Sequence, residues 1–133
     1  MSGGKDLKAL LKTMNPELHD GDYVFCTTTL LNNINSEDII GLFKEDEGWT
    51  VIIGKNLADQ LGLSYTYIAA WITLTIHSSL EAVGLTAAFS NALAAEGISC
   101  NVVAAYYHDH IFVAKQDAEN AISLLKKLAL DSH

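Results

Sequence analysis

The chain has 133 residues, of which 50% are hydrophobic and 18% charged, and its net charge is −8. This length fits one compact domain or two small modules that share a core. An acidic chain repels a phosphate backbone, so the composition excludes a nucleic-acid-binding protein. The high apolar content indicates that some apolar surface meets a second subunit, and we expect a homo-oligomer.

All eight basic residues are lysines, so the chain has no guanidinium group that could hold an anion through two parallel hydrogen bonds. Any anionic ligand must be bound by backbone amides, hydroxyl groups or lysine. The two cysteines, Cys26 and Cys100, lie in apolar strand-like runs without metal-binding spacing, as buried thiols in a reducing compartment do. The N-terminus lacks the pattern of a signal peptide and the apolar runs are too short to span a membrane, so we expect a cytoplasmic protein that binds no membrane.

The first half of the chain alternates helix and strand signals. An apolar stripe from Leu7 to Met14 predicts an amphipathic helix that stops at Asn15, and the following "PELHDGD" has the composition of a turn. "YVFCTTTL" from Tyr23 predicts a strand, and Ser36 is a candidate N-cap for a helix over residues 39–43. A strand "WTVIIG" and a short helix follow, the helix capped by Asn56 and ended by Gly62.

The second half has clearer signals. Residues 65–77 predict a strand in which Ile72, Leu74 and Ile76 face the core, because they alternate with polar and aromatic residues. The clearest helix begins near Leu85 and ends at Gly97, and it is followed by a β-hairpin and a last helix capped by Asp117. Residues 67–133 therefore have the order β-α-β-β-α.

That order predicts an α+β domain of the ferredoxin-like (βαββαβ) type, with an antiparallel sheet and both helices on one face. The last strand of this plan is missing from the second half. We expect "YVFCTT", "WTVIIG" or a neighbouring subunit to complete the sheet.

These elements and their connections resemble the ACT-domain superfamily, in particular a small bacterial ACT-like family. The "VGL" entry to the helix, the "AEGIS" exit and the "YYHDHIFV" hairpin carry the resemblance, which is strong over residues 67–130. Over residues 1–66 the resemblance is looser and matches the preceding, ACT-like N-terminal half. We therefore expect an N-terminal ACT-like half over 1–66 and an ACT domain over 67–133.

The resemblance implies a regulatory module that binds an amino acid or a similar small molecule, without catalysis or a cofactor. ACT domains bind their ligand at the loop after the first strand, often in a dimer of side-by-side sheets. In this chain that loop carries the candidate ligand-binding residues His77, Ser78, Ser79, Leu80, Glu81, Ala82, Val83, Gly84 and Leu85. ACT modules usually accompany an enzyme or a DNA-binding domain, which this chain lacks, so the regulated protein would be a separate chain.

The loop has suitable chemistry for such a ligand. Gly84 has no Cβ, and the amides near the start of the following helix favour a carboxylate. Glu81 or the hydroxyl groups of Ser78 and Ser79 could face an ammonium group. Alternatively, Ser79 and Glu81 only cap the helix and no ligand binds, which would leave a structural or protein-interaction domain.

His108 and His110 flank Asp109 in the hairpin. Their spacing places both rings on one face of a strand, which would suit a metal, and His77 is a third ligand that could approach them. We favour the simpler interpretation, in which Asp109 occupies the turn and the histidines bind the hairpin or the ligand loop. A metal-dependent enzyme that uses His108 and His110 is the least favoured alternative, because the sequence contains no recognisable nucleophile or phosphate-binding motif.

Overall fold

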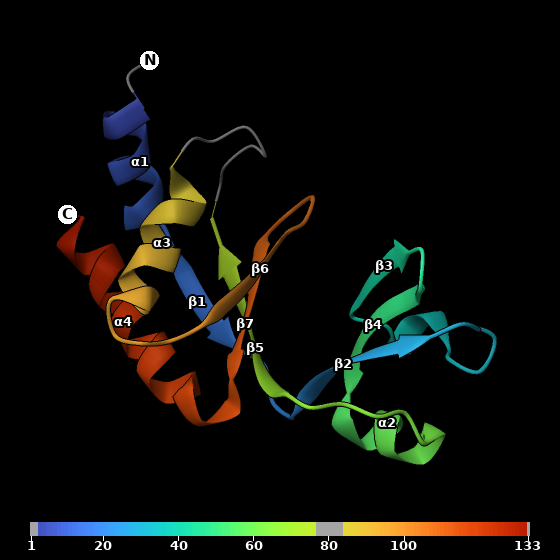
Figure 1. Cartoon of the computed structure of the whole chain (residues 1–133). Coiled ribbons are helices and arrows are strands. Elements are labelled where there is room, and N and C mark those ends of the chain that lie inside the picture. The colour runs from blue at the N-terminus through green and yellow to red at the C-terminus, as the bar shows by residue number, and fades with distance from the viewer. Residues whose placement is uncertain (1–2, 77–83, 133) are drawn as a thin grey trace. The chain divides into compact units, whose positions relative to one another are not determined.

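The computed structural model describes residues 3–76 and 84–132 of the chain. The chain forms two compact units. The discontinuous unit contains residues 1–19 and 71–133, and the continuous unit contains residues 20–70. Figure 1 shows the blue N-terminal helix and strand among the yellow to red elements of the discontinuous unit. The expected boundary between the two halves of the chain, between residues 66 and 67, stays a prediction.

The discontinuous unit has a four-stranded sheet with the strand order β1-β5-β7-β6. β1 pairs antiparallel with β5, with Leu18 opposite Ile72, and β6 pairs antiparallel with β7, with Ala104 opposite Asp109. The strands are β1 (Asn15–Leu18), β5 (Ile68–Thr75), β6 (Cys100–Ala104) and β7 (Asp109–Ala114).

β1 supplies the strand that the second half of the chain lacks. The turn expected over "PELHDGD" is therefore wrong in its first part. Of the strands expected to complete the sheet, "YVFCTT" does pair with β5, with Tyr23 opposite Ala69 and Val24 opposite Ile68. Proline suits this place because an edge strand has one side without ladder hydrogen bonds. Pro16 is buried and faces the core, opposite Leu74.

Figure 1 shows the helices of this unit on one side of its sheet. α1 packs on α3 and α4, and α4 also contacts β1 and β7. The helices are α1 (Gly3–Lys12), α3 (Leu85–Ala94) and α4 (Ala118–Asp131), and α4 follows a short 3₁₀ turn, η2 (Lys115–Asp117). The predicted ferredoxin-like arrangement, with an antiparallel sheet and the helices on one face, is confirmed.

The core of the discontinuous unit lies between the sheet and the helices. The predicted alternation of β5 is correct, because Ile72, Leu74 and Ile76 are all buried. Phe89 of α3 is completely buried, and Gly97 ends that helix region with a positive φ of 75°, as predicted. The other buried side chains of this core include Leu11, Met14, Leu85, Leu93, Ile111, Val113, Ala121 and Leu125.

The continuous unit has β2 paired with β4, and β4 paired with β3, in antiparallel fashion. Its core contains Val24, Cys26, Val51, Ile53 and Ala58, with Ile34 and several half-buried apolar side chains around them. α2 packs on β2 and β4, and the start of β5 pairs with β2. The elements are β2 (Tyr23–Thr28), the 3₁₀ turn η1 (Ser36–Asp38), β3 (Gly41–Glu45), β4 (Gly48–Gly54) and α2 (Lys55–Leu61).

The helix expected over residues 39–43 is wrong, since these residues lead into strand β3. Glycine at position 41 weakens a helix, and the short turn before Gly48 folds β3 back onto β4, with Glu45 opposite Gly48. Phe43 is 71% exposed, so the apolar spacing here did not mark a core-facing helix stripe. The helix after β4 begins at Lys55, before the expected cap Asn56, and ends at Gly62 as predicted.

The two units repeat one strand-to-helix segment. Residues 51–58 and 111–118 have the same order of burial: three consecutive buried residues, a mostly half-buried connection, and a buried alanine, Ala58 or Ala118. In both segments a strand of an antiparallel hairpin leads directly into a helix that packs on the sheet.

Candidate functional site

The predicted ligand loop leads into α3 at Gly84. His77, Ser78, Ser79, Leu80, Glu81, Ala82 and Val83 lie outside the residues that the structure describes. Gly84 has φ 85° and ψ −9°, a left-handed conformation that favours glycine. Its carbonyl oxygen accepts the first hydrogen bond of the helix, from the amide of Ala88. Leu85 is buried, so only its backbone amide is suited to contact a ligand.

The amides between Gly84 and Ala88 have no partner within a regular helix, because a helix leaves its first N–H groups unpaired. These groups and the positive end of the helix dipole form an anion-binding arrangement at the point where residues 77–83 join α3. An added Cβ at Gly84 would lie 3.5 Å from Leu7 Cδ2, which is ordinary contact. The backbone conformation, more than crowding by α1, therefore demands glycine here.

His110 of the hairpin takes part in a polar network on the face of the sheet opposite the helices. Trp71 Nε1 donates a hydrogen bond to His110 Nδ1 over 3.1 Å, and Thr73 Oγ1 lies 3.0 Å from the same nitrogen. The Trp71 ring also lies 6.3 Å from the ring of Phe112, measured between centroids. Trp71 is beside Phe112 and Thr73 is beside His110, so residue numbers rise along β5 where they fall along β7. The end of β5 after Thr73 therefore lies towards His108.

His19, directly after β1, completes this network. Its Nε2 lies 2.6 Å from Thr73 Oγ1, and its ring stacks on Trp71 with a centroid separation of 3.6 Å and an interplanar angle of 10°. Sequence reasoning missed this residue because His19 lies in a stretch with turn composition. The alternation of Pro16 and Leu18 with Glu17 and His19 was the available signal for an edge strand.

Burial favours the neutral form of both network histidines, because it lowers the pKa of each. It is the main cause that lowers the pKa of His110, and the nearby His108 and His19 rings lower the pKa further. Burial also lowers the pKa of His19, while the Glu17 carboxylate opposes that shift. Burial raises the pKa of Asp109. Neutral imidazoles with fixed hydrogen bonds are suited to structural or binding roles at neutral pH.

His108 lies outside this network. Its Nδ1 is buried without a hydrogen-bond partner among the described residues, and its ring centroid is 6.4 Å from that of His110. Within residues 3–76 and 84–132, no three His, Cys, Asp or Glu side chains come together as a metal site would require. The expectation that the protein binds no metal stays a prediction, since His77 lies outside the described residues.

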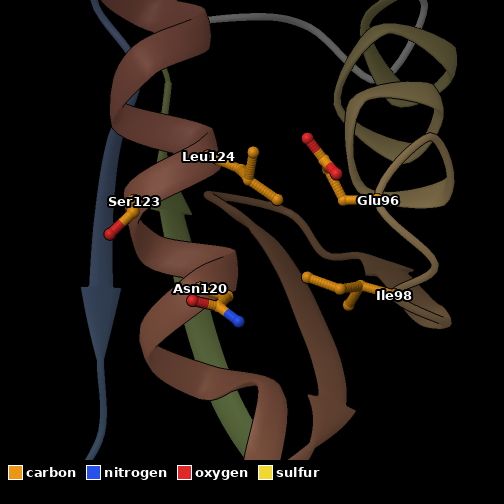
Figure 2. A pocket seen from close by; sticks show the side chains of 5 residues that line it. All are labelled: Glu96, Ile98, Asn120, Ser123 and Leu124. Carbon is orange, nitrogen blue, oxygen red and sulfur yellow. The ribbon is translucent and has the colours of Figure 1, made fainter.

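A cavity of about 330 Å³ opens between the end of α3 and α4. Figure 2 shows Glu96 and Ile98 on one side, directed towards Leu124 of α4, while the Ser123 hydroxyl points away. Asn120 and Ser123 complete the lining. The carboxylate, amide and hydroxyl of this site all belong to solvent-exposed residues, so each hydrogen bond to a ligand would compete with water. Sequence reasoning did not single out these residues, because none of them belongs to a recognisable motif.

The continuous unit has a shallow cavity of about 320 Å³. Most of its lining residues carry a hydroxyl group. The lining consists of Phe25, Cys26, Thr27, Thr50, Ser64, Tyr65 and Thr66. Beside it, Lys55 Nζ and Tyr65 Oη donate to Asp59 over 3.0 Å and 2.7 Å. The bonds from Tyr65 and Lys55 lower the pKa of the Asp59 carboxyl.

Both cysteines are free; Cys26 is buried, as expected, and Cys100 is half-buried. Burial raises the pKa of the Cys100 thiol to about 11, and burial also raises the pKa of Cys26. Both side chains are therefore thiols, not thiolates, at neutral pH, and neither has the character of a catalytic nucleophile.

Comparison with protein families gives two matches. Residues 2–70 match one family model and residues 67–127 match another, and both models describe an ACT domain. No curated protein matches this chain.

Solved structures share the fold. A protein of unknown function from Vibrio cholerae, named a possible transport protein, is 50% identical, with 96% of this chain and 99% of that chain covered and a TM-score of 0.86. A protein from Agrobacterium tumefaciens is 16% identical, with 87% and 89% covered and a TM-score of 0.64. The ligand-free regulatory subunit of aspartate kinase from Thermus thermophilus is 10% identical, with 85% and 95% covered and a TM-score of 0.58. At the two lower identities the likeness concerns the fold alone.

Proposed function

Because the chain belongs to the ACT-domain family and contains two ACT domains in tandem, we propose that it is a non-enzymatic regulatory module that binds an amino acid or a similar small molecule. The observation that supports this most directly is the left-handed Gly84 at the start of α3, where the predicted ligand loop ends. The helix is ten residues long, so its unpaired amides and its dipole are well developed.

A ligand carboxylate would bind to the amides of the first turn of α3. The absence of arginine leaves these amides as the strongest anion-binding groups near the loop. Glu81, or the hydroxyl groups of Ser78 and Ser79, would contact the ligand ammonium. His108 and His110 lie towards the end of β5 that continues into residues 77–83, which is the place expected of residues that contact the loop or its ligand.

A thermal-shift screen of the twenty amino acids identifies the ligand, since a ligand at 100 times its Kd stabilises the folded state by about 2.7 kcal/mol. With that ligand, we expect Gly84→Val to reduce affinity tenfold or more, roughly 1.4 kcal/mol, because the branched side chain blocks the approach to the amides and disfavours the positive φ. Titration calorimetry measures the change.

Gly97→Val is the matched control. Gly97 also has a positive φ, of 75°, and its added Cβ would meet no atom within 4 Å. This variant should therefore lose a similar amount of stability and keep its ligand affinity. Equal affinity losses in both variants would show that the effect is general destabilisation, and an unchanged affinity in folded Gly84→Val would place the ligand elsewhere.

We also propose that the protein forms a homo-oligomer through the β6 edge of the discontinuous unit. β6 is the last strand of its sheet, Val103 on it is 41% exposed, and Tyr106 and Tyr107 at the end of the hairpin are largely exposed. An exposed edge strand with apolar side chains is suited to pair with another copy. Sedimentation at micromolar concentration should show more than one subunit, and Val103→Lys should shift the distribution towards the monomer. A wild-type protein that sediments as a monomer would contradict this assignment.

The regulated protein would be a separate chain in the cytoplasm, a compartment consistent with two unbridged cysteines. Among the described residues, the helices are all too short or too polar to cross a membrane. A structural or protein-interaction domain without a ligand is the alternative function, and the thermal screen separates the two. A metal-dependent enzyme that uses His108 and His110 would require stoichiometric metal in the purified protein, which elemental analysis measures.

A further inference from the structure

The four side chains His19, Trp71, Thr73 and His110 have hydrogen-bond roles that follow from their chemistry. An indole N–H can only donate, so the 3.1 Å bond from Trp71 Nε1 makes His110 Nδ1 an acceptor. His110 must then carry its proton on Nε2 while this bond exists. Trp71 therefore sets the tautomer of His110, because an indole N–H cannot accept a hydrogen bond.

The role of Thr73 follows from that of His110. Because His110 Nδ1 carries no proton, the 3.0 Å contact between Thr73 Oγ1 and this nitrogen is a hydrogen bond only when the hydroxyl donates, and it then shares the one lone pair of the nitrogen with the Trp71 N–H. The hydroxyl has only one proton, so in the 2.6 Å contact with His19 Nε2 it must accept. His19 consequently carries a proton on Nε2. The network thus runs in one direction from His19 through Thr73 to His110, where Trp71 also donates.

We propose that this network is a proton-dependent switch in which a proton on His110 Nδ1 removes the acceptor of Trp71 and Thr73 and releases the Trp71 indole from its position on the sheet. A protonated Nδ1 would face the indole N–H, and two donors cannot bond to each other. Thr73 could rotate its hydroxyl to accept from His110, but Trp71 has no such adjustment. The indole must therefore move, and the ring of His19 stacked on it at 3.6 Å must respond.

His19 responds to acid in a different way. Its network proton is on Nε2, so an added proton would occupy Nδ1 and leave the bond to Thr73 intact. A cationic imidazole would also be attracted by the electron-rich face of Trp71. Of the two rings, only His110 breaks the network when it is protonated.

The groups around His110 determine the pH at which the switch operates. Glu17 of β1 and His19 directly after β1 lie on the same face, with the uncharged Trp71 and Thr73 of β5. Val103 of β6 lies opposite His110, and His108 and Asp109 are the two residues before His110, at the start of β7.

Burial, followed by the His108 and His19 charges, lowers the pKa of His110 below 6.5. As the pH falls through 6.5, the unfolded chain therefore binds this proton before the folded protein does. The free energy of unfolding should decrease as the pH falls below 6.5, and Trp71 should be released at a lower pH, where folded His110 itself becomes protonated.

Two-dimensional ¹H–¹⁵N NMR of the indole groups tests the proposal on the full-length protein. The two tryptophans give two indole signals, and Trp49→Phe identifies the signal of Trp71. Between about pH 8 and pH 5, a range in which histidine titrates, we expect the Trp71 signal to move with a midpoint below 6.5. His110→Asn keeps an acceptor oxygen near the position of Nδ1 but cannot titrate, so this movement should be lost.

His108→Asn is the matched control, because it makes the same change at a neighbouring histidine that is outside the network, and the Trp71 signal should still move. If His110→Asn does not fold, long-range ¹H–¹⁵N spectra of the wild-type imidazoles remain decisive, since they report which nitrogen carries the proton. A proton on His110 Nδ1 at neutral pH, a Trp71 signal that does not move, or an unchanged titration in folded His110→Asn would each overturn the proposal.

Discussion

A fragment of residues 67–133 is expected not to fold into a stable discontinuous unit, although it contains most of that unit's helices and strands. It lacks β1, and with it the ladder of β5 from Asn15 opposite Thr75 to Leu18 opposite Ile72. It also lacks the buried side chains of Leu11 and Met14, each of which stabilises by about 1.5–3 kcal/mol when buried. These losses are comparable to the whole stability of a typical domain, about 5–15 kcal/mol.

Circular dichroism and amide hydrogen exchange of this fragment provide the measurement. We expect no cooperative thermal transition and no protected amides in β5. A synthetic peptide of residues 1–19 added in trans is the control, because it restores the missing strand and helix without changing the fragment. Protected β5 amides in the fragment alone would show that β1 is dispensable.

Phe89→Ala is expected to destabilise the protein by about 3–5 kcal/mol. Phe89 is completely buried on the core face of α3, between Leu85 and Leu93, so truncation leaves a cavity that the surrounding helices and sheet can fill only in part. Urea unfolding followed by circular dichroism measures this loss as a lower midpoint with an unchanged slope.

Phe43→Ala is the matched control for this substitution. The same side chain is removed there, but Phe43 is on the edge strand β3 and is 71% exposed, so its effect should remain within about 0.5 kcal/mol. A loss at Phe43 as large as that at Phe89 would show that Phe43 is buried in an interface in solution.

Local sequence patterns predicted the elements in which apolar residues alternate regularly or in which a glycine marks the end of a helix. The alternation of Ile72, Leu74 and Ile76 and the helix end at Gly97 depend on one segment alone, and both predictions are confirmed. The ligand loop could be assigned from its resemblance to known ACT domains, and it stays a prediction because residues 77–83 are not described.

The errors concern segments whose structure depends on distant partners. The local mark of Asn15–Leu18 as a strand is only a four-residue alternation, and its partner β5 is more than fifty residues away along the chain. Residues 41–45 form a strand only because they pair with β4. His19 could not be grouped with His110 before β1 was known to lie beside β5, which explains why the polar network was missed while one of its histidines was recognised.

The assembly of one unit from both ends of the chain has a consequence for synthesis in the cell. Residues 1–19 are made before the continuous unit, but β5, α3 and α4, which belong to the same unit as residues 1–19, are completed only after it. At about 5–20 residues per second, translation of residues 20–133 takes roughly 6–23 seconds. During that time the apolar side of α1 has no native surface to cover it. Leu11 and Met14 therefore stay uncovered on the nascent chain during this time, and folding of this unit can be completed only after α4 has been made.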